Sequence, residues 1–422
     1  MCPDTTGAYA IAGRTPRQVE YPATIDELGR SVAAAHAANL AVVPVGNGTQ
    51  LHIGRAPTRY DLALSTQRLN RVLAHAAADM TVTVEAGITL ADLNATLAAA
   101  RQRLPLDPPH PERTTIGALI ATDASGPLRL LHGKVRDLLI GITVVLADGT
   151  LAHGGGRVVK NVAGYDLMKL FTGSFGTLGI VVEATFKLRP LPEQEMVCVL
   201  PAETTDGAFG LAVELLRTPV APQYVEALSR AGATCVGLDG PAIVIGCGGI
   251  AEEIAVQRHR LAESSGRRLR VCSASEAERL YAALRDFPTD ARRPGTRDAD
   301  SGCGCILSVR PSQLASLVRS IEEAATRRRV EAAILSHVGN GVAVIRCVDV
   351  ADSAALPSFA DWLRRTVRAA GGWTFFDHLP GSLVRDIDPW DADPPGLALM
   401  RGIKQTLDPS GCLSPGRFVG GI

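Results

Sequence analysis

The most informative stretch of the chain runs from Gly154 to Val181 and reads GGGRVVKNVAGYDLMKLFTGSFGTLGIV. Seven glycines fall within its first 26 residues, interleaved with lysine, tyrosine and aspartate. This density of glycine is unlike a hydrophobic core, and it allows the backbone to approach a large planar ligand closely. The stretch therefore predicts one wall of a ligand site, and the apolar run from Gly179 to Leu188 predicts that the wall ends in a strand.

A short glycine loop lies upstream, directly after the apolar run from Leu40 to Val45, which predicts a buried strand. The loop, Gly46 to Thr49, reads GNGT. Two glycines in four residues allow a tight turn whose successive N–H groups converge on an anion, as in phosphate-binding nests. The dinucleotide fingerprint G-x-G-x-x-G is not met, because Leu51 stands where the third glycine belongs. Considered alone, the loop also fits an ordinary turn between a strand and a helix.

A third segment, Thr114 to Gly126, reads TTIGALIATDASG. Gly117 and Gly126 bracket a short apolar helical turn, and its hydroxyl groups suit phosphate and ribityl oxygens. The alternative is a plain helix start with Thr115 as its N-cap.

The bulk composition bounds the class of protein. The 422 residues are 46% hydrophobic and 20% charged, so we expect two domains with a sizeable core. Acidic and basic residues balance at 43 each, which offers no overall field for nucleic acid. The N-terminus does not resemble a secretory signal, and the apolar run from Leu138 to Ala147 is about half of a membrane span of roughly 20 residues.

The nine cysteines are scattered and lie mostly in apolar segments. We interpret them as reduced, buried residues, because the one close pair, Cys303 and Cys305, lacks the spacing of zinc or iron–sulfur ligands. Electrons that leave this chain would therefore need another subunit to carry them.

The pattern along the chain predicts an α+β protein. In the first half, short apolar strands alternate with helices, two of which begin at the capping boxes Thr24 to Glu27 and Thr89 to Asp92. After Pro192 the pattern changes to β–α–β–β–α, with a helix from Pro311 to about Arg327 and a hairpin turn at Gly339 to Gly341. No internal repeat is visible.

In this order and spacing, the three glycine-bearing segments resemble the FAD-binding domain of vanillyl-alcohol-oxidase-type (PCMH-type) flavoproteins. The phrase from Gly156 to Leu167, with the following Gly176 to Gly179, resembles more narrowly the FAD-binding subunit of bacterial glycolate oxidase. The likeness covers about residues 15 to 192 and reappears at the tail, where Asp408 to Arg417 reads DPSGCLSPGR.

The resemblance implies a two-lobed FAD-binding domain (15–192), a ferredoxin-like cap domain (193–380) centred on residues 300 to 370, and a C-terminal segment (381–422) that returns to the FAD lobe. By carry-over, the glycine loop Gly46 to Thr49, called the diphosphate loop from here on, would hold the cofactor's diphosphate. The segment Thr114 to Gly126 would line the diphosphate and ribityl chain, and the backbone of one further residue would contact the adenine. The residues implied, in that order, are Gly46, Asn47, Gly48 and Thr49, then Thr115, Ile116, Gly117, Ser125 and Gly126, and finally Ile180.

Two departures from the family pattern matter. Relatives that bind flavin covalently carry a histidine where Thr49 stands, so we expect non-covalent FAD. Catalytic relatives that oxidise 2-hydroxy acids share the metal motif His-x-Gly-Asp-Gly-Asn-x-His, whereas this chain has His337, Asn340 in place of the aspartate and Val344 in place of the second histidine. Valine cannot ligate a metal. We therefore expect no metal site and interpret His337 as a satisfied histidine at the end of a strand.

Candidates for catalysis are fewer. His378 and Arg385 lie in a segment, Phe375 to Asp388, that could face the flavin, and an arginine can clamp a substrate carboxylate with two hydrogen bonds. Both residues also fit plain surface positions.

These features predict an FAD-dependent oxidoreductase acting on CH–OH groups. The leading hypothesis is the FAD-binding subunit of a glycolate or other 2-hydroxy-acid oxidase complex, with a catalytic flavin subunit and an iron–sulfur subunit as partners. The alternatives are a stand-alone oxidoreductase of a hydroxy acid or sugar alcohol, and a non-catalytic scaffold. We expect a cytoplasmic protein that reaches the inner face of the cell membrane only through partners.

Overall fold

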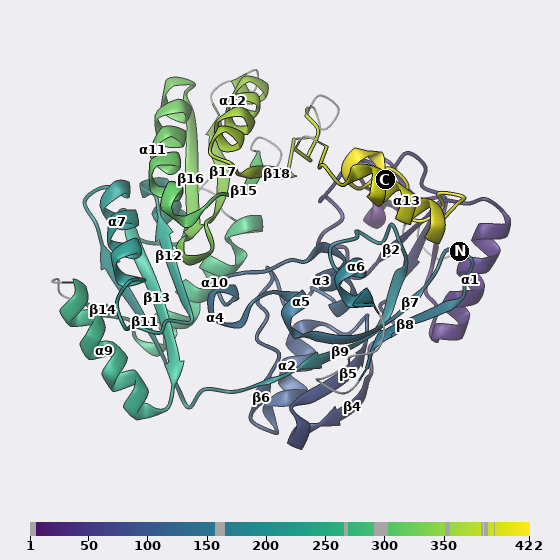
Figure 1. Cartoon of the computed structure of the whole chain (residues 1–422), viewed down its shortest axis with the longest axis horizontal. Coiled ribbons are helices and arrows are strands. Elements are labelled where there is room, and N and C mark those ends of the chain that lie inside the picture. Colours follow the sequence, from purple (N-terminus) through teal and green to yellow (C-terminus); the bar gives the residue numbers. More distant parts are fainter. Residues whose placement is uncertain are drawn as a thin grey trace. The chain divides into compact units, whose positions relative to one another are not determined.

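The computed structural model describes residues 6–156, 165–265, 269–290, 303–350, 355–380, 383, 387–391 and 393–422. The chain divides into two compact units (Figure 1). Unit 1 comprises Met1–Ser125, Gly133–Leu191 and Ala392–Ile422, and unit 2 comprises Gly126–His132 and Pro192–Asp391. The short segment 126–132, which sequence analysis placed in the FAD-binding part, therefore clusters with unit 2.

Unit 1 contains a parallel three-stranded sheet in the order β1-β3-β2 and an antiparallel five-stranded sheet in the order β4-β5-β9-β7-β8. The strands are β1 (Gln18–Glu20), β2 (Val42–Val45), β3 (Leu62–Ser65), β4 (Val72–Ala76), β5 (Thr81–Glu85), β7 (Leu139–Val145), β8 (Leu151–Gly155) and β9 (Ile180–Lys187), with a separate pair of β6 (Gln102–Arg103) and β10 (Arg189–Pro190). The helices are α1 (Ile25–Ala37), α2 (Leu90–Ala98), α3 (Ile116–Thr122), α5 (Val135–Leu138), α6 (Leu167–Phe171) and α13 (Leu397–Leu407), and a 3-10 turn, η1, spans Thr6–Tyr9.

Both predicted capping boxes begin helices. The Thr24 hydroxyl accepts a hydrogen bond from the Glu27 N–H (3.1 Å), and Thr89 does the same for Asp92. Each bond satisfies one of the donors that a helix start leaves open, and an N-cap of this kind is worth about 1 kcal/mol. Helix α2 ends at Ala98, because Arg101 takes a left-handed conformation (φ 57°) and the chain then enters β6.

One core cluster of unit 1 lies between the five-stranded sheet and helices α2 and α3, and another packs α1 against β2 and β3. Alternate residues of the strands, such as Val82 and Val84 of β5 and Phe186 of β9, meet Leu93 of α2 and Ile120 of α3 there. The predicted strands 40–45 and 179–188 are both present, with ends that differ by two residues or fewer.

Unit 2 contains one antiparallel eight-stranded sheet in the order β14-β11-β13-β12-β16-β17-β15-β18. Its strands are β11 (Gln194–Pro201), β12 (Tyr224–Leu228), β13 (Ala242–Gly249), β14 (Arg270–Val271), β15 (Gly304–Ser308), β16 (Val330–His337), β17 (Val342–Val350) and β18 (Trp373–His378). Its helices are α4 (Arg129–His132), α7 (Thr205–Leu215), α8 (Arg230–Cys235), α9 (Ala251–Ser265), α10 (Ala274–Asp290), α11 (Pro311–Arg327) and α12 (Ala355–Ala369).

The sheet of unit 2 is built from two β-α-β-β-α-β halves. The first half places its four strands in the order 4-1-3-2, and the second places its own in the mirrored order 2-3-1-4. This is the ferredoxin-like arrangement twice over, joined where β12 pairs with β16. From the sequence we predicted only the second half and no repeat, because the two halves share a strand order but no visible pattern of residues.

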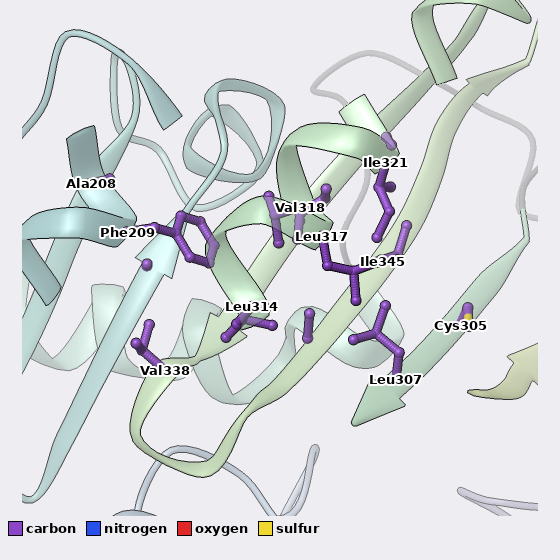
Figure 2. Packing of buried hydrophobic residues seen from close by; sticks show 14 of the residues in the cluster. Ala208, Phe209, Cys305, Leu307, Leu314, Leu317, Val318, Ile321, Val338 and Ile345 are labelled. Carbon is purple, nitrogen blue, oxygen red and sulfur yellow. The ribbon is translucent and has the colours of Figure 1, made fainter. Parts of the chain in front are cut away.

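Helices cover both faces of this sheet. On one face, α11 buries Leu314, Leu317, Val318 and Ile321, which recur at helical spacing and point toward the sheet, with Phe209 of α7 beside them (Figure 2). The other face buries residues of α10 and α8. The predicted helix 311–327 has the bounds that α11 shows, and Gly341, with φ of 67°, closes the predicted hairpin between β16 and β17.

Candidate cofactor site

A groove crosses unit 1 between the end of β2, helix α3 and the segment before β9. Its two adjoining parts contain about 500 and 420 Å³ of empty space, and Gly46 and Gly176 border both. One end is lined by Leu51, Phe175 and Arg417, and the other by Ile180 and Val181. Four segments far apart in sequence, the last of them at Arg417, thus contribute to the walls of one site.

The diphosphate loop, Gly46 to Thr49, presents main-chain donors at this groove. Within the part of the chain that the structure describes, its four N–H groups make no hydrogen bond. Gly48 has a φ of +76°, a conformation that glycine adopts at little cost. A buried or half-buried run of unused N–H groups is what a phosphate nest offers to an anion, so the loop fits a diphosphate.

Two side-chain hydrogen bonds hold the first two residues of the diphosphate loop. The amide Nδ2 of Asn47 donates to the main-chain oxygen of Arg113 (2.9 Å), and the amide Nε2 of Gln67 donates to the oxygen of Gly46 (3.1 Å). Asn47 itself was predicted to bind the cofactor, but its side chain is engaged with the protein.

Gly46 lies against helix α3. A Cβ on Gly46 would come within 2.2 Å of the Thr115 hydroxyl, so no larger residue fits without displacement. Thr115 is fully buried and caps α3 by accepting from the Ala118 N–H (3.4 Å). The structure therefore supports the plain helix-cap interpretation of Thr115 while also placing it at the loop.

The N-terminus of α3 has fewer donors for a ligand than the sequence suggested. The N–H groups of Ile116 and Gly117 donate to the main-chain oxygens of Ile88 (2.9 Å) and Ala86 (2.7 Å), and the Ile116 side chain is in the core. Gly117 borders the groove together with Ala118, Ala121 and Thr122. Their spacing of three and four residues marks one helix face of small side chains, a signal that sequence analysis did not use.

The other predicted cofactor residues are placed as follows. Ile180 is buried at the start of β9 and borders the groove. Ser125 and Gly126 follow the left-handed Asp123 that ends α3, and they are not among the groove-lining residues of the described chain. Of the glycine-rich stretch from Gly154 to Val181, residues 157–164 lie outside the described residues.

The segment before β9 brings an aromatic ring to the groove. Phe175 has a φ of +57°, which is unusual for a residue other than glycine, and its N–H donates to the Ala121 oxygen (2.9 Å). Its ring packs against Phe418 with centroids 5.6 Å apart. Gly176 follows, also left-handed, and its backbone lies so near Pro44 that a Cβ would come within 2.6 Å of the proline ring.

The predicted closing motif returns to this groove. Leu413 forms a parallel bridge to Val42 of β2, and the Ser414 N–H donates to the Val42 oxygen (2.8 Å). Asp408 accepts from the N–H groups of Cys412 (3.0 Å) and Leu413 (2.8 Å) and pairs with Lys404 (2.6 Å).

Arg417 ends the motif as a buried cation on the groove wall. It donates to the main-chain oxygens of Leu51 (3.1 Å) and Ile53. Burial lowers the pKa of its guanidinium to about 10, against the opposing effect of Tyr60, so it keeps its positive charge at neutral pH.

In unit 2, His337 is a satisfied histidine, as predicted. Its Nδ1 lies 2.8 Å from Oε1 of Glu226 on the neighbouring strand β12, and both side chains are buried. Burial raises the pKa of Glu226, with the charges of His337 and Arg129 acting in the opposite direction. Val344 is buried in the hydrophobic cluster on this face. Among the described residues, no group of three or more histidine, cysteine, aspartate or glutamate side chains could hold a metal.

The predicted catalytic residues stay predictions. His378 ends β18, opposite Gly304, and Arg385 lies outside the described residues. Beside His378, Asp377 forms a buried ion pair with Arg346 of β17, at 3.0 Å between Oδ1 and Nη1. Sequence analysis did not find this pair, nor that of Glu226 and His337, because strand register alone brings these residues together.

The described residues contain no helix that is both long enough and apolar enough to span a bilayer.

Comparisons with known proteins agree with this architecture. The FAD binding domain family matches residues 16–155, and the C-terminal domain family of FAD linked oxidases matches residues 192–418. Among solved structures, p-cresol methylhydroxylase superimposes with a TM-score of 0.76 at 15% identity, covering 98% of this chain and 92% of that one, which shows a shared fold.

Three curated relatives extend the likeness. Glycolate oxidase subunit GlcD of Bacillus subtilis (strain 168) is 27% identical, covering 96% of this chain and 89% of that protein. D-lactate dehydrogenase of Archaeoglobus fulgidus is 30% identical, covering 94% and 90%. Glycolate oxidase subunit GlcE of Escherichia coli (strain K12) is 34% identical over 152 residues, 36% of this chain and 43% of that protein. The resemblance and the α+β fold predicted from sequence are confirmed: the chain belongs to the FAD linked oxidases, and FAD is the cofactor of this oxidoreductase.

Proposed function

We propose that the chain is an FAD-binding subunit of a complex that oxidises a small 2-hydroxy acid such as glycolate, passing electrons to an iron–sulfur partner. The observation that carries the proposal is the groove of unit 1, with its unused N–H groups in the diphosphate loop. Relatives over nearly the whole chain include a glycolate oxidase subunit and D-lactate dehydrogenases, which supports a hydroxy acid as the substrate class.

Flavin supplies the redox chemistry in such enzymes by accepting a hydride equivalent. The residues of this chain bind and orient it. The N–H groups of Gly46 to Thr49 would hold the diphosphate, and the backbone of Ile180 would contact the adenine. Phe175 and Arg417 line the end of the groove that lies away from Ile180. The cationic Arg417 favours negative charge there, since the surrounding wall is buried.

We infer that FAD is bound non-covalently. Thr49 stands at the position where covalently flavinylated relatives carry histidine. Among the described residues that line the groove, none is a histidine, cysteine or tyrosine. Denaturation should therefore release the flavin intact.

An auxiliary role is favoured by unit 2. His337 is engaged with Glu226, and Val344 occupies the place of the second histidine of the metal motif. A substrate held by metal in catalytic relatives would need other groups here, for which we propose His378 and Arg385. A stand-alone dehydrogenase is the second candidate, because D-lactate dehydrogenase of Archaeoglobus fulgidus matches this chain over 90% of its length.

An absorption spectrum of the purified chain, followed by anaerobic addition of glycolate or D-lactate, tests these proposals. Bound flavin that stays oxidised until a catalytic partner and an iron–sulfur partner are added would support the auxiliary subunit. Flavin that bleaches in the isolated chain would favour the stand-alone dehydrogenase. A colourless protein that takes up no added FAD would refute the assignment of the groove.

A further inference from the structure

The orientation of the diphosphate loop depends on a side chain outside it. Gln67 lies two residues beyond β3, and its amide Nε2 donates to the Gly46 oxygen (3.1 Å). In a trans peptide the C=O and the following N–H point in opposite directions. Fixing the Gly46 oxygen toward Gln67 therefore turns the Asn47 N–H away from Gln67, and fixes the plane of the first peptide of the loop.

The N-terminal segment packs against the strand that leads into the loop. Tyr9, a buried residue of η1, lies in one hydrophobic cluster with Val43 and Val45 of β2. Tyr9 is fixed in turn by two other tyrosines: its hydroxyl lies 3.1 Å from that of Tyr21, and its main-chain oxygen accepts from the Tyr60 hydroxyl (3.0 Å). Burial and the hydrogen bond with Tyr21 raise the pKa of Tyr9 to about 12, so its phenol stays neutral at neutral pH.

We propose that Gln67 is a positioning residue for the FAD diphosphate, which it orients through the Gly46 carbonyl. The loop is then clamped at two points, by Gln67 at Gly46 and by Asn47 at the Arg113 carbonyl. Because both clamps use carbonyl or side-chain groups, the N–H groups of the loop stay available for the anion. This inference rests on the proposed placement of the diphosphate at Gly46 to Thr49.

Gln67→Met keeps the length and volume of the side chain and removes its donor. The expected result is roughly two- to tenfold weaker FAD binding, the range of a single hydrogen bond. Gln67→Glu places a carboxylate against the Gly46 oxygen and a negative charge behind the nest, so its loss of affinity should be larger. Gln18→Met is the matched control, because Gln18 is an exposed glutamine on β1, which pairs with β3, and among the described residues its side chain bonds only Glu20.

The experiment titrates FAD into each apoprotein and records the ³¹P spectrum of bound FAD. Gln67→Met should move the diphosphate resonances and leave the urea midpoint of the apoprotein close to that of Gln18→Met. Gln67→Glu should move the same resonances further and serves if Gln67→Met does not fold. Unchanged affinity and unchanged ³¹P shifts in folded Gln67→Met would overturn the inference. Wild-type protein that leaves the ³¹P resonances of added FAD unchanged would instead refute the proposed site.

Discussion

Replacing Gly46 by alanine tests whether the diphosphate loop is packed as tightly as the structure shows. A Cβ there would lie 2.2 Å from Oγ1 of Thr115 and 3.0 Å from its Cγ2. Either the loop or Thr115 must move. Thr115 is fully buried, so its displacement breaks the cap of α3. Movement of the loop would reorient the N–H groups that face the groove.

The free-energy loss expected for Gly46→Ala follows from the displacement of either the loop or Thr115. Overpacking of a buried contact costs about 1 to 3 kcal/mol, and loss of a threonine cap costs about 1 kcal/mol. We therefore expect Gly46→Ala to lose about 2 to 4 kcal/mol in total, divided between the unfolding free energy of the apoprotein and the binding free energy of FAD. Each 1.4 kcal/mol that falls on binding weakens FAD affinity about tenfold.

Urea unfolding of the apoprotein and fluorimetric titration with FAD measure the two parts. Gly210→Ala in α7 is the matched control, since nothing lies within 4 Å of a Cβ there, and it should be neutral or stabilising by up to about 1 kcal/mol. In a double-mutant cycle, Thr115→Ala should offset part of the Gly46→Ala loss, because only its Cβ, at 3.1 Å, remains in the way. Strict additivity, or a Gly46→Ala variant as mild as Gly210→Ala, would refute the packing argument.

Three further predictions concern other parts of the chain. Acid precipitation of the purified protein should leave FAD in the supernatant, and flavin that stays with the pellet would contradict non-covalent binding. Asp408→Asn leaves the Lys404 ammonium buried without its carboxylate, so calorimetry at pH 7 should show a loss of about 3 to 5 kcal/mol. Burial raises the pKa of Asp408, but hydrogen bonding from Lys404 outweighs this effect and lowers the folded-state pKa below 3.8. The stabilisation by Asp408 is therefore full above that pH and is lost as the pH falls below it, where the unfolding free energies of the variant and the wild type should converge. His337→Ala should cost about 3 to 5 kcal/mol in urea unfolding at pH 8 by leaving Glu226 buried alone. Because burial raises the pKa of Glu226, this loss should shrink at pH 5, where the lone carboxyl can take up a proton; an equal loss at both values would contradict the pairing.

Local patterns predicted those parts of the fold that local physics determines. The box at Thr24 begins α1 because the hydroxyl and the Glu27 N–H are three residues apart. The apolar residues of 311–327 recur every three or four positions, so helical periodicity within this segment alone predicts α11. A tight turn at Gly46 to Thr49 could be predicted because two glycines follow a buried strand within four residues, and its role as a phosphate nest stays a prediction.

Contacts between distant strands could not be predicted in this way. Glu226 and His337 are 111 residues apart and meet because β12 and β16 join the two halves of the sheet in unit 2. Arg346 and Asp377 meet across β15, which pairs with both of their strands. The role of Gln67 was equally hidden, since nothing in its neighbourhood of sequence points to a carbonyl 21 residues earlier. The doubled ferredoxin-like order lies in the topology and leaves no trace at the level of residues.

The two units use their polar groups differently, and this difference bears on function. In unit 2, the buried side chains of Glu226 and Arg346 pair with His337 and Asp377 of the same sheet. In unit 1, the N–H groups of Gly46 to Thr49 meet no acceptor among the described residues, although two side chains are committed to holding that loop in place. Unmade main-chain hydrogen bonds are costly where water is excluded, so a loop clamped in this state is stabilised by the anion that completes it. Binding of FAD should therefore raise the unfolding temperature of unit 1 more than that of unit 2, and Gln67→Met should reduce that difference.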